Sequence, residues 1–277
     1  KPELLKEDNK IKISILGRPN SGKSTLTNFL LQEDRQLVGE TAGLTRDTVS
    51  EEFEWKKNKY IIIDTPGLRK KSKISDEVEK KSSKSSLRAI DASDISILII
   101  DASIGFDKQD LIISNYMEEK GKPFILAINK WDLIKDKREY KSEILDKVSK
   151  SLSQFKGASI VFISSKSGHG VEELMETVLQ IYNLSLVEIS THKLNSFLDK
   201  VTSKHTHPTH NGREVRFKYI TQINSNPIYF AIFTNKPKAV LDSYKRYLLN
   251  NLREEFSLSG VPIKIVYKKT DNPYKKN

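Results

Sequence analysis

The chain has 277 residues, of which 37% are hydrophobic and 30% charged, and its net charge is +11. The length suits two domains, and the composition excludes collagen-like and membrane-spanning classes, because no apolar run approaches the roughly 18 residues that a spanning helix needs. Without any cysteine the chain can form neither disulfides nor thiolate metal sites, so a reducing cytoplasm is the expected compartment. Because no apolar run is long enough to span a bilayer, no membrane contact is expected.

The first two thirds of the chain alternate short apolar runs with longer amphipathic stretches. Residues 1–10 are polar and are predicted to be a linker. Near-continuous Ile, Val and Leu strands separated by helices predict an α/β fold with a mostly parallel sheet covered on both faces, which binds its ligand at the carboxyl ends of the strands. The predicted strands are 11–16, 60–63, 95–100, 124–128 and 159–163, and the predicted helices are 23–31, 108–120, 139–153 and 171–182.

The first strand leads into Gly17-Arg-Pro-Asn-Ser-Gly-Lys23-Ser24, which fits the phosphate-loop spacing G-x-x-x-x-G-K-[ST]. Backbone N–H groups of such a loop surround phosphates, Lys23 reaches the β and γ phosphates, and Ser24 ligates Mg²⁺. The residues predicted to bind a nucleotide here are Gly17, Arg18, Pro19, Asn20, Ser21, Gly22, Lys23, Ser24 and Thr25.

Two further segments are expected to complete the magnesium and γ-phosphate site. Asp64, at the carboxyl end of the second strand, can hold Mg²⁺ through water, and the Gly67 N–H can meet the γ-phosphate. Thr45 is the candidate hydroxyl that closes the Mg²⁺ shell. The residue after Gly67 is Leu68, where many GTPases have a glutamine. Leucine cannot orient water by hydrogen bonding, so the usual water-positioning side chain is missing. The predicted binding residues of this segment are Asp64, Thr65, Pro66 and Gly67.

Asn129-Lys130-Trp131-Asp132 follows the fourth strand and is expected to select the base. The Asp132 carboxylate can accept from N1–H and the exocyclic amine of guanine, a donor pair that adenine lacks, which favours GTP over ATP. Asn129 is expected to brace the loops, the Lys130 stem to pack on the base, and Trp131 to pack in the core. Ser164, Ser165 and Lys166, after the last strand, can offer backbone N–H groups to the guanine O6.

The order of elements changes after Ser185. A helix over 187–202, strands over 213–223 and 227–234, a helix over 236–256 and a strand over 262–268 predict a smaller α+β domain with its helices on one side. Residues 186–277 carry 16 Lys and Arg against 7 Asp and Glu, so they hold nine of the eleven net positive charges. A polyanionic partner is the sharper explanation and a well-solvated surface the plainer one.

Together these motifs resemble the G domains of translation-factor-type GTPases. More narrowly, the phosphate loop, the loop ending in Thr-Arg-Asp, Asp-Thr-Pro-Gly-Leu-Arg-Lys-Lys and Asn-Lys-Trp-Asp are similar to the second G domain of the EngA (Der) family of bacterial ribosome-assembly GTPases. Ile220-Thr-Gln, Ser243-Tyr-Lys-Arg-Tyr-Leu and Gly260-Val-Pro-Ile resemble that family's C-terminal KH-like domain. The resemblance covers about residues 11–273 and implies a GTPase domain over 11–185 and a KH-like domain over 186–277.

What the resemblance implies is a GTP-hydrolysing switch in the biogenesis of the large (50S) ribosomal subunit, with rRNA of the subunit or its precursor as partner. It implies GTP/GDP, Mg²⁺ and K⁺ as cofactors, with Asn20 holding K⁺ beside the β and γ phosphates, so that Lys23, Thr45 and Asn20 act in catalysis. The family carries two tandem G domains, and an N-terminal G domain is expected to be missing here. Leu44 stands where the family usually has a threonine.

Several alternatives stay open on the sequence alone. KH domains clamp RNA with a GXXG loop, which residues 186–277 lack, so the basic residues there contact either ribosomal RNA or the G domain. The Lys-rich stretch 70–88 is either a nucleotide-gated contact or a solvated loop. His205, His207 and His210 have a metal-like spacing but no acidic or thiol partner beside them. The alternative function is a nucleotide-binding RNA or protein adaptor with negligible turnover. The basic residues of 186–277 that are expected to contact ribosomal RNA or the G domain are Arg213, Arg216, Lys218, Lys245 and Arg246.

Overall fold

The computed structural model of the chain describes residues 10–38, 50–63, 86–151, 159–209 and 212–269. Its contacts divide the chain into two units, Lys1–Tyr182 and Asn183–Asn277. Among the described residues, no helix combines the length and the apolar character that crossing a bilayer requires. The two units have separate sheets and separate cores.

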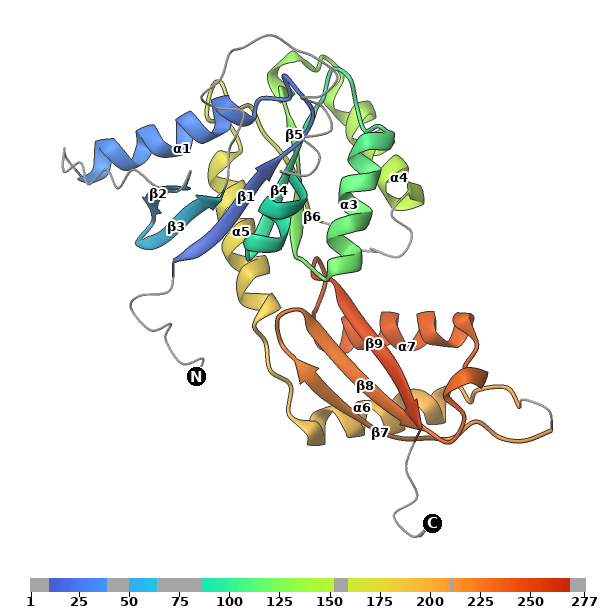
Figure 1. The fold of residues 1–277 in the computed structure, drawn as a ribbon. Coiled ribbons are helices and arrows are strands. Elements are labelled where there is room, and N and C mark those ends of the chain that lie inside the picture. The colour runs from blue at the N-terminus through green and yellow to red at the C-terminus, as the bar shows by residue number, and fades with distance from the viewer. Residues whose placement is uncertain (1–9, 39–49, 64–85, 152–158, 210–211, 270–277) are drawn as a thin grey trace. The chain divides into compact units, whose positions relative to one another are not determined.

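The first unit is built on a six-stranded sheet of order β2-β3-β1-β4-β5-β6. All neighbouring strands pair in parallel except β2, which runs antiparallel to β3 at the edge. Figure 1 shows α1 and α5 on one side of this sheet and α3 and α4 on the other. The prediction of a mostly parallel sheet covered on both faces is confirmed. The strands are Ile11–Leu16, Ser50–Trp55, Asn58–Ile63, Ile95–Asp101, Phe124–Asn129 and Ser159–Phe162 (β1 to β6), and the helices are Lys23–Val38, Lys108–Lys120, Lys137–Ser151 and Val171–Ser185 (α1, α3, α4 and α5).

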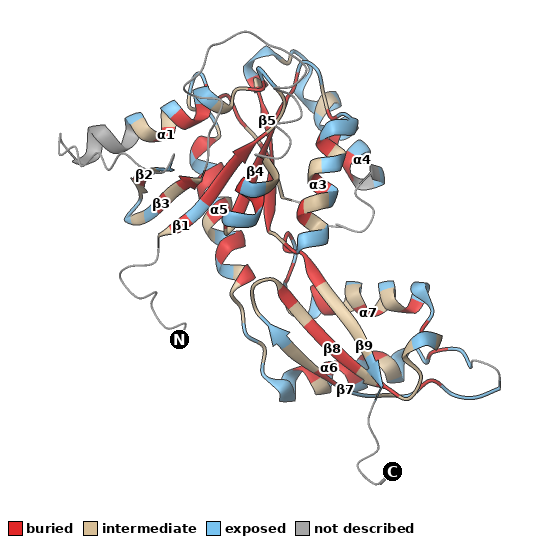
Figure 2. Ribbon diagram, in the orientation of Figure 1, coloured by how far each residue is buried: buried red, intermediate tan, exposed pale blue. Residues whose placement is uncertain are grey.

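Burial explains why the central strands lack the polar alternation of a half-exposed sheet. Every residue of β4 and β5 is buried, and both strands are red along their length in Figure 2. Helices on both faces leave no solvent-facing side, so the sequence of each strand is almost continuously apolar before its last residue, with the buried Ser96 as the exception in β4. The polar residues that end these strands, Asp101 and Asn129, therefore stand out as positions that packing does not require.

The second unit has a three-stranded sheet of order β7-β8-β9, in which β7 is antiparallel and β9 parallel to β8. Figure 1 shows α6 and α7 on the same side of this sheet. This arrangement confirms the predicted α-β-β-α-β order with helices gathered on one side. The elements are α6 (Thr191–Lys204), β7 (Phe217–Asn224), β8 (Ile228–Thr234), α7 (Asp242–Glu255) and β9 (Ile263–Lys269).

Several elements differ from the sequence-based expectation; α1 extends to Val38 instead of ending at residue 31, and β7 begins at Phe217 instead of residue 213. Strand β2 was not predicted, because its sequence SEEFEW is mostly charged and only Phe53 is buried. The single helix predicted over 236–256 is wrong: a 3₁₀ turn, η2 (Pro237–Ala239), comes first, and α7 begins only at Asp242. Val240 and Leu241 between them are extended, because Pro237 favours a separate short turn and the buried Val240 interrupts the helical path.

Candidate nucleotide-binding site

The described part of the predicted site lies at the carboxyl ends of β1, β5 and β6, which share one edge of the sheet. Residues 17–22 follow β1, the Asn129–Asp132 segment ends β5, and Ser164–Lys166 follows β6. Thus the structure gathers three of the predicted segments at one place. Five predicted residues lie outside the described residues, namely Thr45, Asp64, Thr65, Pro66 and Gly67.

Two glycines shape the loop between β1 and α1. Gly17 has φ +142°, and a Cβ there would lie 2.3 Å from the Ile99 carbonyl oxygen. Gly22 has φ +104°, and a Cβ there would lie 2.0 Å from Asn129 Nδ2. Both positions combine a left-handed backbone with contacts that leave no room for a side chain. The loop sequence is therefore dictated by close approach of neighbouring segments as well as by turn geometry.

Lys23 folds back over this loop from the first turn of α1. Its ammonium donates to the carbonyl oxygens of Gly17 at 2.8 Å and Arg18 at 2.7 Å. Burial lowers the pKa of Lys23 below its usual value, since desolvation disfavours the charged form. Ser24 and Thr25 lie at the start of the same helix, and Asn20 is exposed with φ +63°. A cation poised over a loop of this shape suits phosphate oxygens.

Asn129 joins two loops through one side chain, in a residue that is 2% exposed. Its Nδ2 donates to the Ser21 carbonyl oxygen at 2.8 Å, and its Oδ1 accepts from both the backbone N–H and the hydroxyl of Ser165, each at 2.9 Å. The expected bracing by Asn129 is thus observed. Because both ends of the carboxamide are used, the phosphate loop and the loop after β6 are held in one fixed relation.

Asp132 is exposed at the mouth of the site. The Ser164 hydroxyl beside it is the largest cause that holds the pKa of this carboxyl below its usual range, followed by its own backbone N–H. An ionised carboxylate is the state that accepts two hydrogen bonds from a base edge. Trp131 is 7% exposed and packs against the Phe162 ring at 4.5 Å between centroids, which confirms its predicted place in the core.

Asp101, at the carboxyl end of β4, is a site residue that the motifs did not reveal. Its carboxylate accepts from the Ser103 hydroxyl at 2.6 Å and pairs with the Lys130 ammonium at 2.5 Å. Burial raises the pKa of Asp101, but the hydrogen bonds from Lys130 and Ser103 outweigh it and leave the pKa low. This pair fixes the Lys130 stem, which was expected to pack on the base. The available signal was a charged residue at the end of a strand that is otherwise apolar except for Ser96.

Arg18 forms a second unpredicted contact, between the phosphate loop and α3. Its guanidinium donates to the Gly105 carbonyl oxygen and lies 3.5 Å from the Asp107 carboxylate and 3.2 Å from that of Asp110. Asp107 and Asp110 also form the capping box that begins α3. Burial raises the pKa of the Asp110 carboxyl despite the backbone hydrogen bond from Asp107 and the nearby Arg18. The phosphate loop is thereby anchored to a helix end.

In the second unit, both ring nitrogens of His207 form hydrogen bonds with backbone groups. Its Nδ1 lies 2.6 Å from the Pro208 carbonyl oxygen, and its Nε2 accepts from the Leu241 N–H at 3.0 Å. Both nitrogens are therefore occupied in a neutral imidazole with the proton on Nδ1. No cluster of three metal-ligating side chains occurs among the described residues, and His210 lies outside them.

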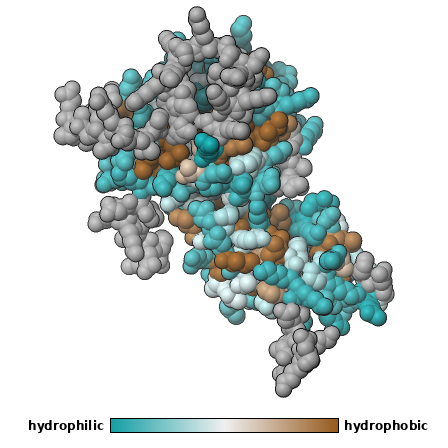
Figure 3. Space-filling model, in the orientation of Figure 1, coloured by the Kyte–Doolittle hydropathy of each residue, from teal (hydrophilic) through white to brown (hydrophobic). Residues whose placement is uncertain are grey.

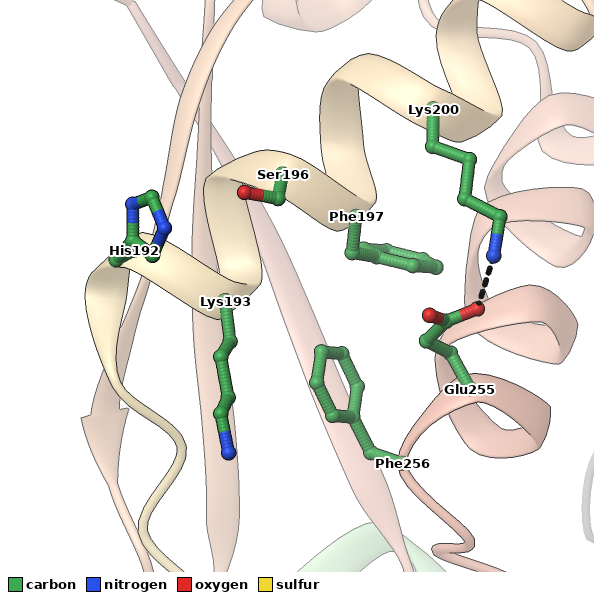
Figure 4. A pocket seen from close by; sticks show the side chains of 7 residues that line it. All are labelled: His192, Lys193, Ser196, Phe197, Lys200, Glu255 and Phe256. Atoms are coloured by element: carbon green, nitrogen blue, oxygen red, sulfur yellow. Dashed lines mark hydrogen bonds and ion pairs between the residues drawn. The ribbon is translucent and has the colours of Figure 1, made fainter.

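The basic residues predicted to contact RNA or the G domain are mostly exposed, and two are paired locally. Arg216 lies 2.7 Å from Glu214, and Lys245 lies 2.8 Å from Asp242. Elsewhere in this unit a groove opens between α6 and the end of α7 (Figure 4), where Lys200 pairs with Glu255 at 2.8 Å. No sequence motif predicted this groove. Its lining residues are His192, Lys193, Ser196, Phe197, Lys200, Glu255 and Phe256.

Comparison with known proteins assigns a class to each part of the chain. A model described as 50S ribosome-binding GTPase matches residues 12–130, so the first unit is a P-loop GTPase domain. A model described as the KH-domain-like of EngA bacterial GTPase enzymes, C-terminal, matches residues 188–268. The chain belongs to the EngA (Der) family of bacterial GTPases.

Individual relatives agree with this assignment. The chain is 39% identical to GTPase Der of Agrobacterium fabrum and 41% identical to GTPase Der of Bartonella tribocorum, in each case over 97% of this chain and 56% of the relative. It therefore spans about half the length of the curated relatives that it matches. Among solved structures it is similar to a point variant of Aquifex aeolicus Era bound to GDP.AlF4⁻, with a TM-score of 0.49, 24% identity and coverage of 95% of each chain.

Proposed function

We propose that the chain binds and hydrolyses GTP and acts as a nucleotide-dependent switch in the biogenesis of the large (50S) ribosomal subunit. The observation that carries the proposal is the Asn129 bridge, which fixes the phosphate loop beside the base-recognition segments. A binding site for a guanine nucleotide needs phosphate and base contacts at a set separation, and this bridge supplies it. We also propose domain limits of 11–185 for the GTPase domain and 186–277 for the KH-like domain.

Features of the described residues support a nucleotide at this site. Gly17 and Gly22 leave space where a Cβ would clash, and Lys23 is a partly desolvated ammonium that donates to carbonyl oxygens of the loop itself. Ser24 would ligate Mg²⁺, with Thr45 directly and Asp64 through water. Bound Mg²⁺ neutralises charge on the β and γ phosphates. The proposed nucleotide contacts are residues 17–25, 64–67, 129, 130, 132 and 164–166.

Asn20 is proposed to hold K⁺ beside the phosphates, where a cation offsets the charge that develops as the γ-phosphoryl group leaves. Its exposed side chain and left-handed backbone are compatible with this role. Hydrolysis by the chain is therefore expected to be slow and faster in K⁺ than in Na⁺ at equal ionic strength. Phosphate release in the two salts, with Asn20→Ala beside the wild type, tests this; equal rates in both salts contradict it.

Co-sedimentation tests the switch itself. Large ribosomal subunits are incubated with the chain in a non-hydrolysable GTP analogue or in GDP, and binding is expected to be stronger with the analogue. Calorimetry with GTP and ATP in the presence of Mg²⁺ is run in parallel. Equal sedimentation in both nucleotides, with negligible phosphate release, would instead favour the adaptor. No preference for guanine over adenine nucleotides would refute the proposed site.

A further inference from the structure

The sheet of the second unit has one face covered by its helices and one that its described helices leave open. Side chains alternate between the two faces of a strand. Ile220, Phe230 and Ile232 point to the covered face and are 0% exposed. Their neighbours Tyr219 and Phe233 point to the open face, where Tyr219 is 41% exposed and Phe233 is partly exposed.

Aromatic rings and lysines share this open face in an ordered pattern. The Tyr219 and Phe233 rings stack with centroids 4.2 Å apart and planes inclined by 15°. Register pairs Phe233 with Tyr219 on one side and with Lys268 on the other, and pairs Tyr229 with Lys264. Side chains of paired residues lie on the same face. Two rows that run across the sheet therefore end in lysines on β9.

The charge on the strands has one sign. Strands β7, β8 and β9 contain four lysines and no Asp or Glu, the lysines being Lys218, Lys264, Lys268 and Lys269. In Figure 3 this side of the second unit shows hydrophobic surface beside hydrophilic surface, over the strands that Figure 1 draws in front. Aromatic rings whose charged neighbours on these strands are all lysines suit a ligand that is itself both flat and anionic.

We propose that this open face, defined by Tyr219, Tyr229, Phe233, Lys264 and Lys268, binds single-stranded RNA. Unpaired bases stack on the rings, and the two lysines contact phosphates. Sheet-borne aromatic side chains recognise unstacked RNA bases in this way, independently of a GXXG loop. The inference rests on the proposed ribosomal function and locates its RNA contact. A protein partner on this face is the alternative occupant, and the test below distinguishes it from RNA.

The test measures binding of a ten-nucleotide, fluorescein-labelled single-stranded RNA to the whole chain by fluorescence anisotropy. Because stacking on one aromatic side chain is worth about 1–3 kcal/mol per base, Tyr219→Ala is expected to weaken binding roughly tenfold or more. Tyr219→Phe is the matched control, because it keeps the ring, and is expected to bind like the wild type. Circular dichroism verifies that both variants fold.

Salt dependence separates the rings from the lysines. Each phosphate contact to a single strand contributes about −0.7 to the slope of log K against log salt concentration. Lys268→Gln is expected to reduce the slope by about that amount, whereas Tyr219→Ala lowers affinity without changing the slope. Lys200→Gln, in the α6–α7 groove of Figure 4, is expected to leave both unchanged. An equal effect of Lys200→Gln and Lys268→Gln would overturn the proposal.

Other outcomes distinguish this inference from the proposed function. If the wild type shows nucleotide-dependent sedimentation with ribosomal subunits but Tyr219→Ala binds RNA as tightly as the wild type, the sheet-face proposal is wrong and the switch stands. If the wild type binds no RNA but self-associates through a contact that Tyr219→Ala abolishes, the face is a protein surface and the proposal is overturned. Failure of GTP binding refutes the switch, and the RNA measurement still decides the sheet face.

Discussion

At the scale of single residues, Gly22 is the position where a minimal change is expected to do most damage to the nucleotide site. In Gly22→Ala the new methyl group would lie 2.0 Å from Asn129 Nδ2, so the Asn129 side chain must move away from Ser21. A left-handed backbone adds roughly 1–2 kcal/mol of strain for a non-glycine residue. We expect guanine-nucleotide affinity to fall at least tenfold, as measured by calorimetry with GDP and Mg²⁺.

A second glycine provides the matched control for this experiment. Gly212 has φ +68°, and a Cβ there would meet nothing within 4 Å. Gly212→Ala therefore places an alanine at a positive φ without a clash, and is expected to leave nucleotide affinity unchanged. Equal losses in both variants would show that strain alone matters and that contact with Asn129 does not.

At the scale of elements, Asp110 couples the start of α3 to the phosphate loop and makes stability depend on pH. Burial raises the pKa of this carboxyl above its ordinary 3.8, so the folded state binds its proton more tightly than the unfolded state does. The contribution of Asp110 to the free energy of unfolding is therefore largest below pH 3.8 and decreases as pH rises through the raised pKa. Asp110→Asn removes this decrease.

Urea unfolding of the wild type and Asp110→Asn at several pH values checks the sign. The chain has two tryptophans, Trp55 and Trp131, both in the first unit, so tryptophan fluorescence follows that unit alone. The variant is expected to gain stability relative to the wild type as pH rises above about 4. A relative loss over the same range would show that the Arg18–Asp110 ion pair outweighs the cost of burial.

The start of α7 depends on a histidine in an analogous manner. His207 Nε2 accepts from the N–H of Leu241, the residue that caps α7. In His207→Phe the ring packing against Tyr244 is kept but the acceptor is lost, which costs about 1–3 kcal/mol for a buried donor and less for a partly exposed one. We expect a loss of roughly 1 kcal/mol in urea unfolding followed by circular dichroism. His192 is exposed, so His192→Phe is expected to leave the free energy of unfolding unchanged. A comparable loss in that variant would refute the specific role of His207.

The sequence predicted those elements whose apolar pattern is strong and local. Strand β1 and helix α3 agree with the expected bounds, because a strand rich in isoleucine and leucine and a helix with a capping box each mark their own ends. Strand β2 and the break before α7 were missed since both are set by tertiary packing, around Phe53 and Val240. Among site residues, the motif positions were identifiable, whereas the partners Asp101, Asp107 and Asp110 belong to no motif. Their roles depend on which strand ends lie side by side in the folded chain.

At the scale of the whole molecule, the two units are expected to respond differently to nucleotide. A ligand at 100 times its Kd stabilises the state that binds it by about 2.7 kcal/mol. GDP with Mg²⁺ should therefore raise the unfolding midpoint seen by tryptophan fluorescence and leave the second unit's transition in place. ATP at the same concentration is the control. A shift of both transitions by GDP would show that the units unfold together.

The carboxamide of Asn129 has a consequence for how product leaves. One side chain joins the loop at Ser21 to the loop at Ser165, so in the proposed GTPase cycle neither loop would be free to relax separately after the γ-phosphate leaves. In the proposed cycle, release of GDP would require these hydrogen bonds to break together, and the rate of that step would limit turnover.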